Sequence, residues 1–417
     1  MRGVRTSLVM AAALVLTACG ALGDDDQASE PLDVLGMSDA GSSGSASGSP
    51  DFLPESPRED VASALDNPIG DGLPEPLVDP SRIQSGGPPP DGIPPVDEPR
   101  FDTIADVDWL ADNEPVLALT IDGQARAYPV QIMMWHEIVN DHVAGVPVAV
   151  TFCPLCNSAL VFDRRLTGPD GADRLVSFGT SGQLYNSDLL MYDRQTESLF
   201  SQLIGLGVAG VLTGVELDRY PVQTVSYGSW REQNPDGLVL NRITGQERNY
   251  GANPYESYDE EDRDPFLFDG VVDDRLPPKR RVVGVATPDG SSALAVDHAL
   301  LERKGVVDVS FDGRDLVAVL VTGGASALSS GTIAENDPVG ATAVLDPVVN
   351  GQRLTLAVEG DGLRDAETGT TWSVAGQGLD GPLAGSSMQA LAHTDPFWFA
   401  WAAFYPDTDL VLGSAQP

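Results

Sequence analysis

The sequence predicts an α+β protein that is predominantly β, with two homologous β-rich units from an internal duplication. Most of the chain after residue 100 consists of short apolar runs rich in β-branched residues, separated by Gly/Asp turns. Segments with helical periodicity are few. Pieces of residues 100–245 recur in residues 280–413, and self-similarity of this kind indicates a repeated unit.

Residues 1–18 have the features of a lipoprotein signal peptide. Arg2 and Arg5 precede a short apolar run, and Leu16-Thr-Ala-Cys19 resembles a bacterial lipobox. We therefore expect Cys19 to be acylated and to anchor the protein to membrane lipid, on the extracytoplasmic side of the cell envelope. The alternative is an ordinary secretory signal with an incidental cysteine.

Residues 19–80 are expected to form a disordered acidic tether rich in Pro, Gly and Ser. Residues 20–100 contain 17 acidic residues against 3 basic ones, and 14 of the 32 prolines. Such a composition buries too little apolar surface to offset the entropy of ordering. The whole chain carries a formal charge of −38, which excludes nucleic acid as a partner because phosphate binding needs basic patches. The sequence identifies no protein partner.

The first unit is expected over residues 81–247. It begins with a strand from Leu117, an Asp-Gly turn and a short strand at Ala125–Tyr128. Residues 132–139 predict a helix, because apolar residues fall at positions i, i+3 and i+7. The apolar, β-branched run Val146–Phe152 predicts a buried strand, and Ala159–Phe162 predicts another.

Residues 248–279 read as an acidic linker, and residues 280–413 as a second, degenerate unit. In that unit the Asp-Gly turn and the following strand recur at 289–296, and residues 389–404 predict a helix broken at Pro396. Asp193 and Thr196 of the first unit recur as Asp365 and Thr368. This recurrence favours a structural role in tight turns for both pairs.

The two units differ at a Cys-Pro-Leu-Cys motif. Cys153 and Cys156 align with Val321 and Gly324, and His136 aligns near Arg303. This asymmetry predicts one live site in the first unit, with the second unit as scaffold. The alternative is that the cysteines are a late and unimportant addition.

The spacing of Cys153 and Cys156 allows three kinds of chemistry. Both thiolates could bind a transition metal, for which copper or zinc suits the ligands best, with His136 as third ligand and Met191 or Glu137 as further candidates. The pair could instead cycle between dithiol and disulfide. In a non-catalytic envelope-binding module, a disulfide would only stiffen the turn. The metal site is the leading hypothesis, and whether the protein is an enzyme stays open.

Helix geometry raises an objection to His136 as a ligand. If residues 140–145 connect the helix to the strand, His136 lies near the beginning of that strand, about 23 Å from Cys153. Other polar candidates for the site are Tyr185, Arg194, Glu197 and Gln202, which follow a Gly/Ser turn at residues 178–182 in the sequence. No Ser-His-Asp hydrolase signature, nucleophile elbow or nucleotide-binding loop is present.

Six short motifs punctuate the chain: Ser85-Gly-Gly-Pro88, Asp91-Gly-Ile-Pro94, Trp135-His-Glu-Ile-Val-Asn-Asp141, Thr151-Phe-Cys-Pro-Leu-Cys156, Phe178-Gly-Thr-Ser-Gly182 and Tyr192-Asp-Arg-Gln-Thr-Glu-Ser198. Together they resemble the DUF3179 family, a bacterial and archaeal domain of unknown function. The resemblance extends over about Arg82 to Leu412. It implies a shared exported domain and names no activity. Asn157 departs from the pattern, in which Gly or another small residue is expected.

Overall fold

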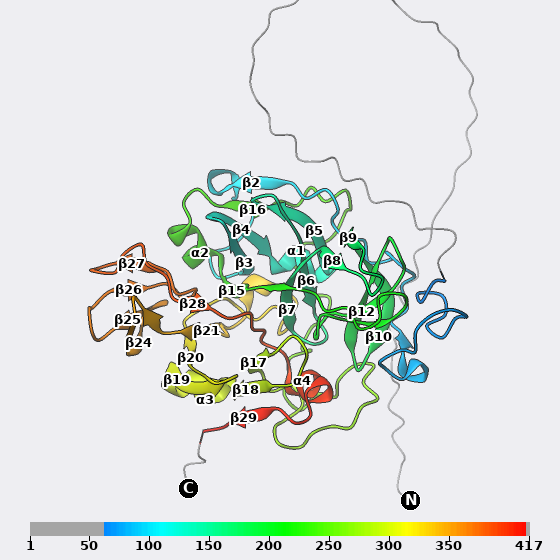
Figure 1. Ribbon diagram of the computed structural model, residues 1–417. Helices are drawn as coiled ribbons and strands as arrows, with labels where there is room; N and C mark the ends of the chain where they lie inside the picture. Colours follow the sequence, from blue (N-terminus) through cyan, green and yellow to red (C-terminus); the bar gives the residue numbers. More distant parts are fainter. Residues whose placement is uncertain (1–61, 414–417) are drawn as a thin grey trace, which may run out of the picture. The chain divides into compact units, whose positions relative to one another are not determined.

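The computed structural model describes residues 62–413, and the predominantly β architecture is confirmed (Figure 1). This part of the chain contains 29 strands and 4 helices. The predicted signal peptide, the acylation site Cys19 and most of the predicted tether lie outside the described residues. Residues 62–413 belong to one compact unit.

Three antiparallel or mixed sheets and one hairpin make up the first half. The first sheet has the order β1-β10-β11-β12-β13, the second β14-β7-β6-β5 and the third β15-β3-β4-β16-β2. The strands are β1 Gln84–Ser85, β2 Phe101–Thr103, β3 Pro115–Ile121, β4 Gln124–Pro129, β5 Ile138–Val143, β6 Val146–Cys153, β7 Ser158–Asp163, β8 Arg165–Thr167, β9 Asp173–Leu175, β10 Phe178–Tyr185, β11 Asp188–Asp193, β12 Leu199–Ser201, β13 Leu206–Ala209, β14 Arg219–Tyr220, β15 Gln223–Ser226 and β16 Leu238–Leu240.

The second half contains three more sheets and another hairpin. Their orders are β17-β18-β29, β19-β20-β21-β28 and β24-β25-β26-β27, with β22 paired to β23. The strands are β17 Val282–Ala286, β18 Ala293–Asp297, β19 Val306–Phe311, β20 Arg314–Val321, β21 Ala341–Asp346, β22 Val348–Val349, β23 Gln352–Arg353, β24 Leu356–Glu359, β25 Gly362–Asp365, β26 Thr371–Trp372, β27 Gly378–Asp380, β28 Gln389–Ala390 and β29 Asp409–Val411.

The helices are short. Each α-helix has seven residues, and three single 3₁₀ turns accompany them. None of the helices in residues 62–413 has the length and apolar character needed to cross a bilayer. The helices are α1 Val130–His136, α2 Tyr227–Gln233, α3 His298–Lys304 and α4 Trp398–Phe404, and the 3₁₀ turns are η1 Pro80–Arg82, η2 Ile104–Asp106 and η3 Ile333–Glu335.

The two predicted helices differ from the observed ones for identifiable reasons. The first ends at His136 rather than at residue 139, because Glu137 has a left-handed φ of 59° and the chain turns into β5. Val139, which completed the helical pattern, is a buried residue of that strand. The second begins only after Pro396, and Gln389–Ala390 forms strand β28 instead. Proline disfavours the helical conformation of the residue before it, which explains the late start.

The last residues of the predicted tether are packed rather than free. Ala64 is fully buried in a small hydrophobic cluster with Leu190 and Leu199 of β11 and β12. The backbone N–H of Leu77 donates a hydrogen bond to Val208 O at 2.8 Å. Any tether therefore ends before residue 62, because the following segment contributes apolar surface to the sheet.

Each sheet of the second half follows the strand order of a sheet in the first half, without counterparts of the edge strands β1, β2 and β15. The sheet β28-β21-β20-β19 corresponds to β14-β7-β6-β5, and β24 to β27 correspond to β10 to β13. In both halves a hairpin gains a parallel third strand, β16 beside β4 and β29 beside β18. This correspondence is what a duplication would produce. The common origin of the halves stays a prediction.

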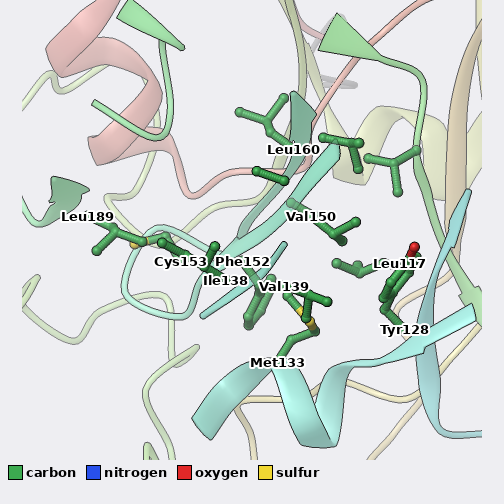
Figure 2. Packing of buried hydrophobic residues seen from close by; sticks show 14 of the residues in the cluster. Leu117, Tyr128, Met133, Ile138, Val139, Val150, Phe152, Cys153, Leu160 and Leu189 are labelled. Atoms are coloured by element: carbon green, nitrogen blue, oxygen red, sulfur yellow. The ribbon is translucent and has the colours of Figure 1, made fainter. Parts of the chain in front are cut away.

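The halves share hydrophobic cores. One cluster contains Val116 and Val225 together with Val317 and Trp372. Another contains both cysteines and extends to Phe397 and other residues of the second half. In Figure 2, Cys153 and Leu189 lie at one end of this second cluster, and Leu117 and Tyr128 lie at the other.

Two-residue turns close five hairpins, and both turn residues have positive φ in each. In four of them the second residue is glycine, which adopts this conformation without steric cost. The fifth is the β10–β11 hairpin, where Ser187 occupies that position with a φ of 67°. The four with glycine are Asp122-Gly123, Ala144-Gly145, Asp312-Gly313 and Asn350-Gly351.

The packing of residues 86–92 against β10 predicts a large effect of one methyl group. Gly182 has a φ of 72°, and a Cβ there would overlap the carbonyl oxygen of Pro88. We expect Gly182→Ala to lower the free energy of unfolding by about 2–4 kcal/mol, from left-handed strain plus overpacking. Gly123→Ala is the matched control, because Gly123 has a φ of 79° and nothing within 4 Å of its Cβ position. It should cost only about 1 kcal/mol. Equal losses in urea denaturation would show that the Pro88 contact is unimportant.

Candidate functional site

The two cysteines lie in the loop of the β6–β7 hairpin. Strand β6 ends at Cys153, which pairs with Ser158, the first residue of β7. Pro154 to Asn157 form the connecting loop, and the Asn157 N–H donates a hydrogen bond to Pro154 O. The predicted strand Val146–Phe152 and the strand character after Cys156 are both confirmed. This arrangement brings the two sulfurs to one side of the loop.

A second hairpin tip meets this loop. The carbonyl oxygen of Ser187 lies 3.8 Å from Cys153 Sγ and 3.6 Å from Cys156 Sγ, so each thiol can donate to it. Ser187 is itself held by a hydrogen bond from its hydroxyl to Phe266 O. A serine in the left-handed region costs conformational energy that a glycine would not. That strain coincides with the contact to the two sulfurs, as is common at functional sites.

Asp188 completes the cluster. One oxygen from its carboxyl group and the two sulfurs all lie within 4.8 Å of one another, and Oδ1 is 3.9 Å from Cys156 Sγ. The other oxygen, Oδ2, accepts hydrogen bonds from Ser201 Oγ at 2.6 Å and from Leu203 N at 3.2 Å. Asp188 therefore has one oxygen fixed by the protein and one free to face the thiol of Cys156.

The cluster is buried and resists negative charge. Cys153 is 2% exposed, and Cys156 and Asp188 are fully buried. Burial is the main cause that raises the pKa of the Cys156 thiol well above its usual range, and the neighbouring Cys153 and Asp188 add to it. Burial also raises the pKa of Asp188 to about 7. At neutral pH Asp188 can therefore both accept and release a proton.

The second half of the chain holds the cysteine loop in place. The N–H of Phe397 donates a hydrogen bond to Cys156 O at 2.9 Å, and Asn157 Nδ2 donates to Asp395 O at 2.7 Å. The N–H of Ala159 donates to Thr394 Oγ1. Asn157 has a φ of 55°, and asparagine is among the residues that tolerate this region best after glycine. Its departure from the expected small residue therefore keeps the turn and adds a contact to the second half.

Residues 248–279, predicted as a linker, pack against the same loop. Burial is the main cause that raises the pKa of the Tyr255 and Tyr258 hydroxyls, and the nearby cysteines add to it. Lys279 is 1% exposed; its Nζ donates to Tyr258 O at 2.6 Å and lies 3.1 Å from the centre of the Tyr258 ring. Burial lowers the pKa of Lys279 to about 7, and Cys156 is one of the groups that oppose this. Among residues 62–413, no carboxylate forms an ion pair with it.

His136 is not brought into the cluster, although the objection to its position was wrong. Strand β5 returns antiparallel along β6, so the end of α1 lies beside the end of β6, and Phe152 N donates to Glu137 O. The His136 ring nevertheless has other partners: Nδ1 donates to Pro94 O and Nε2 accepts from the Tyr250 hydroxyl, both at 2.6 Å. Burial lowers its pKa, which fits a neutral ring with one donor and one acceptor.

The other two proposed ligands are buried nearby with no ligand role apparent. Met191 is fully buried in the hydrophobic cluster that contains the cysteines. Glu137 is 7% exposed and lines a separate cavity, and burial raises its pKa to about 8.

Three of the four other polar candidates have structural partners away from the sulfurs. Arg194 forms ion pairs with Asp91 at 3.1 Å and Asp97 at 2.8 Å, which tie the N-terminal segment to β11. The Tyr185 hydroxyl accepts from Arg82. Glu197 lies in the turn that the Asp193 carboxylate holds through Thr196 and Ser198.

Gln202 is adjacent to the site. Its Oε1 accepts from Ser158 Oγ at 2.7 Å and its Nε2 donates to Thr151 Oγ1 at 2.9 Å, which joins β12 to both strands of the cysteine hairpin. Asp365 repeats the Asp193 turn in the second half by accepting from Thr368 and Thr370, as the recurrence predicts.

Sequence reasoning missed Asp188, Lys279 and Tyr255 as members of the site. Asp188 is one of 62 acidic residues, and only its place at the start of an apolar strand sets it apart. Lys279 had a clearer signal, because the chain contains only two lysines, Lys279 and Lys304. Tyr255 belongs to a segment without periodicity, from which no contact could be inferred.

The cluster could bind a metal with three side chains, two thiolates and one carboxylate. Structural zinc sites in proteins almost always have four protein ligands, and catalytic ones have three plus water. The donor set therefore fits an open zinc or copper site, provided that both thiols and the carboxyl group lose their protons. The raised pKa values of Cys156 and Asp188 oppose that loss in the metal-free protein.

The family described as "Protein of unknown function (DUF3179)" matches residues 90–408. No curated protein matches the chain, and no solved structure matches it either. The comparisons therefore establish kinship and leave the chemistry to be argued from the cluster.

The raised pKa of Asp188 predicts a pH-dependent stability. The folded protein binds this proton more tightly than the unfolded chain, in which the pKa is near 3.9. Its contribution is therefore greatest at low pH and is lost as the pH rises from about 4 to about 7. Between pH 4 and pH 7 the free energy of unfolding of Asp188→Asn should fall by about 2–4 kcal/mol less than that of the parent. The reason is that the amide keeps an acceptor for Ser201 and carries no charge. Urea denaturation of the reduced protein at pH 4, 5.5 and 7 measures it. Parallel curves for the parent and the variant would contradict the assignment.

Proposed function

The chain is a member of the DUF3179 family, and we propose that it is a thiol–disulfide oxidoreductase whose redox pair is Cys153 and Cys156. The observation that carries the proposal is the buried carboxyl group of Asp188 beside the more buried of two adjacent thiols. A disulfide is uncharged, so a desolvated site accommodates either the dithiol or the disulfide more easily than a thiolate. A buried acid with a pKa of about 7 supplies the proton transfer that links the two forms.

The reaction balances in two exchange steps. In the first, Cys153 Sγ bonds to one sulfur of a substrate disulfide, whose S–S bond breaks, and the released thiol takes the proton that Cys153 loses. In the second, Cys156 Sγ bonds to Cys153 Sγ and the proton of Cys156 passes to the Asp188 carboxylate. The remaining substrate sulfur leaves as a thiol when Asp188 returns that proton to it. The protein gives up two electrons and the substrate disulfide becomes two thiols. The reverse sequence oxidises a dithiol.

Burial assigns the roles within the pair. Cys156 is fully buried and contacts Asp188, which suits the resolving cysteine, the one that attacks the mixed disulfide. Cys153 has slight exposure, which suits the cysteine that meets the substrate. Lys279, close to Cys156, favours the developing thiolate by its charge.

The approach to the pair lies on the side of Leu155. This residue of the cysteine loop lines a cavity of about 390 Å³ together with Tyr255, Tyr258 and Phe266. Because both sulfurs are buried, a substrate reaches Cys153 only when this aromatic cover moves. The cover belongs to residues 248–279, a segment of turns and coil that moves at lower cost than a strand.

A zinc or copper site at the same residues is the second candidate, favoured by the convergence of two sulfurs and a carboxylate within 4.8 Å. Two features weigh against the metal site. His136, the expected third ligand, has partners at both ring nitrogens. The cluster also lacks a fourth side-chain ligand among residues 62–413.

The location follows from the lipobox-like segment. We place the redox pair on the extracytoplasmic side of the envelope, with the acyl chains on Cys19 as the anchor in membrane lipid. Disulfide exchange is a chemistry of such oxidising compartments.

Trapping of a mixed disulfide tests the proposed roles. The full chain carrying Cys19→Ala has only Cys153 and Cys156 as thiols. In that background, Cys156→Ser should retain one glutathione after incubation with oxidised glutathione, because no second thiol resolves the adduct. Cys153→Ser should form the adduct at least tenfold more slowly, because Cys156 is buried and its pKa is high. Intact-mass measurement over time gives both rates.

The matched control is the same background with both cysteines intact. It should release the glutathione and end as an internal disulfide. Equal adduct formation in the two single variants, or none in either, would contradict the assigned roles.

A further inference from the structure

A second cavity lies beside the cysteine loop and shares Leu155, Tyr255 and Phe266 with the cavity on the substrate approach. It measures about 190 Å³ and is mostly apolar, with Leu155, Leu189, Tyr255 and Phe266 in its wall. A cavity of roughly 150 Å³ is large enough to hold benzene. The space beside Glu137 is therefore sufficient for a molecule with a single ring or a short alkyl chain.

Glu137 is the charged group in the wall of this cavity. It is 7% exposed, and among residues 62–413 no group donates a hydrogen bond to its carboxyl oxygens, so that burial alone acts on its pKa. A buried carboxyl group without a partner is costly, and proteins rarely keep one without use. It therefore needs an explanation beyond packing.

The backbone conformation of Glu137 is a second reason to expect a role for its carboxyl group. Glu137 caps α1 with a φ of 59°, and its carbonyl accepts from Phe152 N. The corresponding helix of the second half, α3, is capped by Gly305 with a φ of 71°, and Gly305 O likewise accepts from Leu320 N. Glycine meets this geometry without strain, whereas glutamate does not. The first half therefore accepts strain at a position where it also places a carboxyl group in a cavity.

Glycine and proline motifs that the redox chemistry leaves unexplained build another part of the wall. Gly86 and Pro88 lie against Gly182 of β10, and the Gly86 N–H donates to Gly182 O at 2.8 Å. Thr180 Oγ1 donates to Ile93 O at 2.7 Å, which uses the hydroxyl and leaves the wall apolar. These close backbone contacts shape the cavity that Glu137 also lines.

We propose that this cavity binds a small organic ammonium ion, with the ammonium group paired to Glu137 and the apolar part against Leu189, Tyr255 and Phe266. A cation supplies the partner that the carboxyl group lacks, and aromatic rings in the wall attract it further. The net charge of −38 raises the concentration of cations around the protein and repels anions. The proposal does not depend on the redox function.

Calorimetric titration of the full chain with benzylamine tests the proposal, with benzyl alcohol as the uncharged probe of the same shape. Benzylamine should bind at least tenfold more tightly than benzyl alcohol. Glu137→Gln should abolish that preference and leave the binding of benzyl alcohol unchanged. No binding of benzylamine, equal binding of the two probes, or an unchanged preference in Glu137→Gln would overturn the proposal.

A second measurement on the parent protein applies even if the variant does not fold. Glu137 is protonated at pH 7 before binding, since burial raises its pKa to about 8. Pairing with the ammonium group should therefore release close to one proton, which titrations in buffers of different ionisation enthalpy count. The titratable group near Glu137 is Tyr255. Binding without proton release would overturn the pairing with Glu137.

Discussion

Two thiols and one carboxyl group share a desolvated space in which, among residues 62–413, no cation forms an ion pair with the carboxyl group, and the rest of the site depends on this constraint. Each of the three groups gains a negative charge on ionisation, and burial penalises every such charge. Burial therefore raises the pKa of Cys156 and of Asp188. The protein fixes one carboxyl oxygen with Ser201 and Leu203 and turns the carbonyl of Ser187 toward both sulfurs. Chemistry that ends in an uncharged S–S bond suits this environment. Chemistry that needs three simultaneous anions requires a metal to compensate them.

The geometry of this space comes from hairpin tips and from the half of the chain that has no cysteine. The β6–β7 loop and the β10–β11 turn meet at the sulfurs, and the segment 394–397 holds the loop through three hydrogen bonds. The second half therefore holds the cysteine loop in place, although its own corresponding loop contains no cysteine. This arrangement agrees with the prediction of a functional site in the first half and a second half that serves as scaffold. It also explains why the two halves share cores instead of forming separate bodies.

The sequence predicts those features that local pattern determines. The buried strand before Cys153, the strand after Cys156 and the Asp193 turn follow from periodicity and recurrence, and they are observed. Patterns fail where one residue adopts an unusual backbone conformation. The apolar spacing around residues 132–139 is helical, but Glu137 enters the left-handed region, and nothing about a glutamate signals this. Because of this turn, His136 lies beside the end of β6 and not beside its beginning, where the helical pattern had placed it. Asp188 could not be selected among so many acids, because only tertiary contact distinguishes it.

The central claim is that Cys153 and Cys156 interconvert between dithiol and disulfide. A redox titration of the full chain carrying Cys19→Ala, in buffers of varied thiol-to-disulfide ratio, tests it most directly. Alkylation and mass measurement give the fraction oxidised at each ratio. The account predicts one reversible transition with the slope of a two-electron couple, with both thiols disappearing together. Thiols that remain unoxidised at every ratio, or that resist alkylation because an equimolar metal ion is bound, would contradict it.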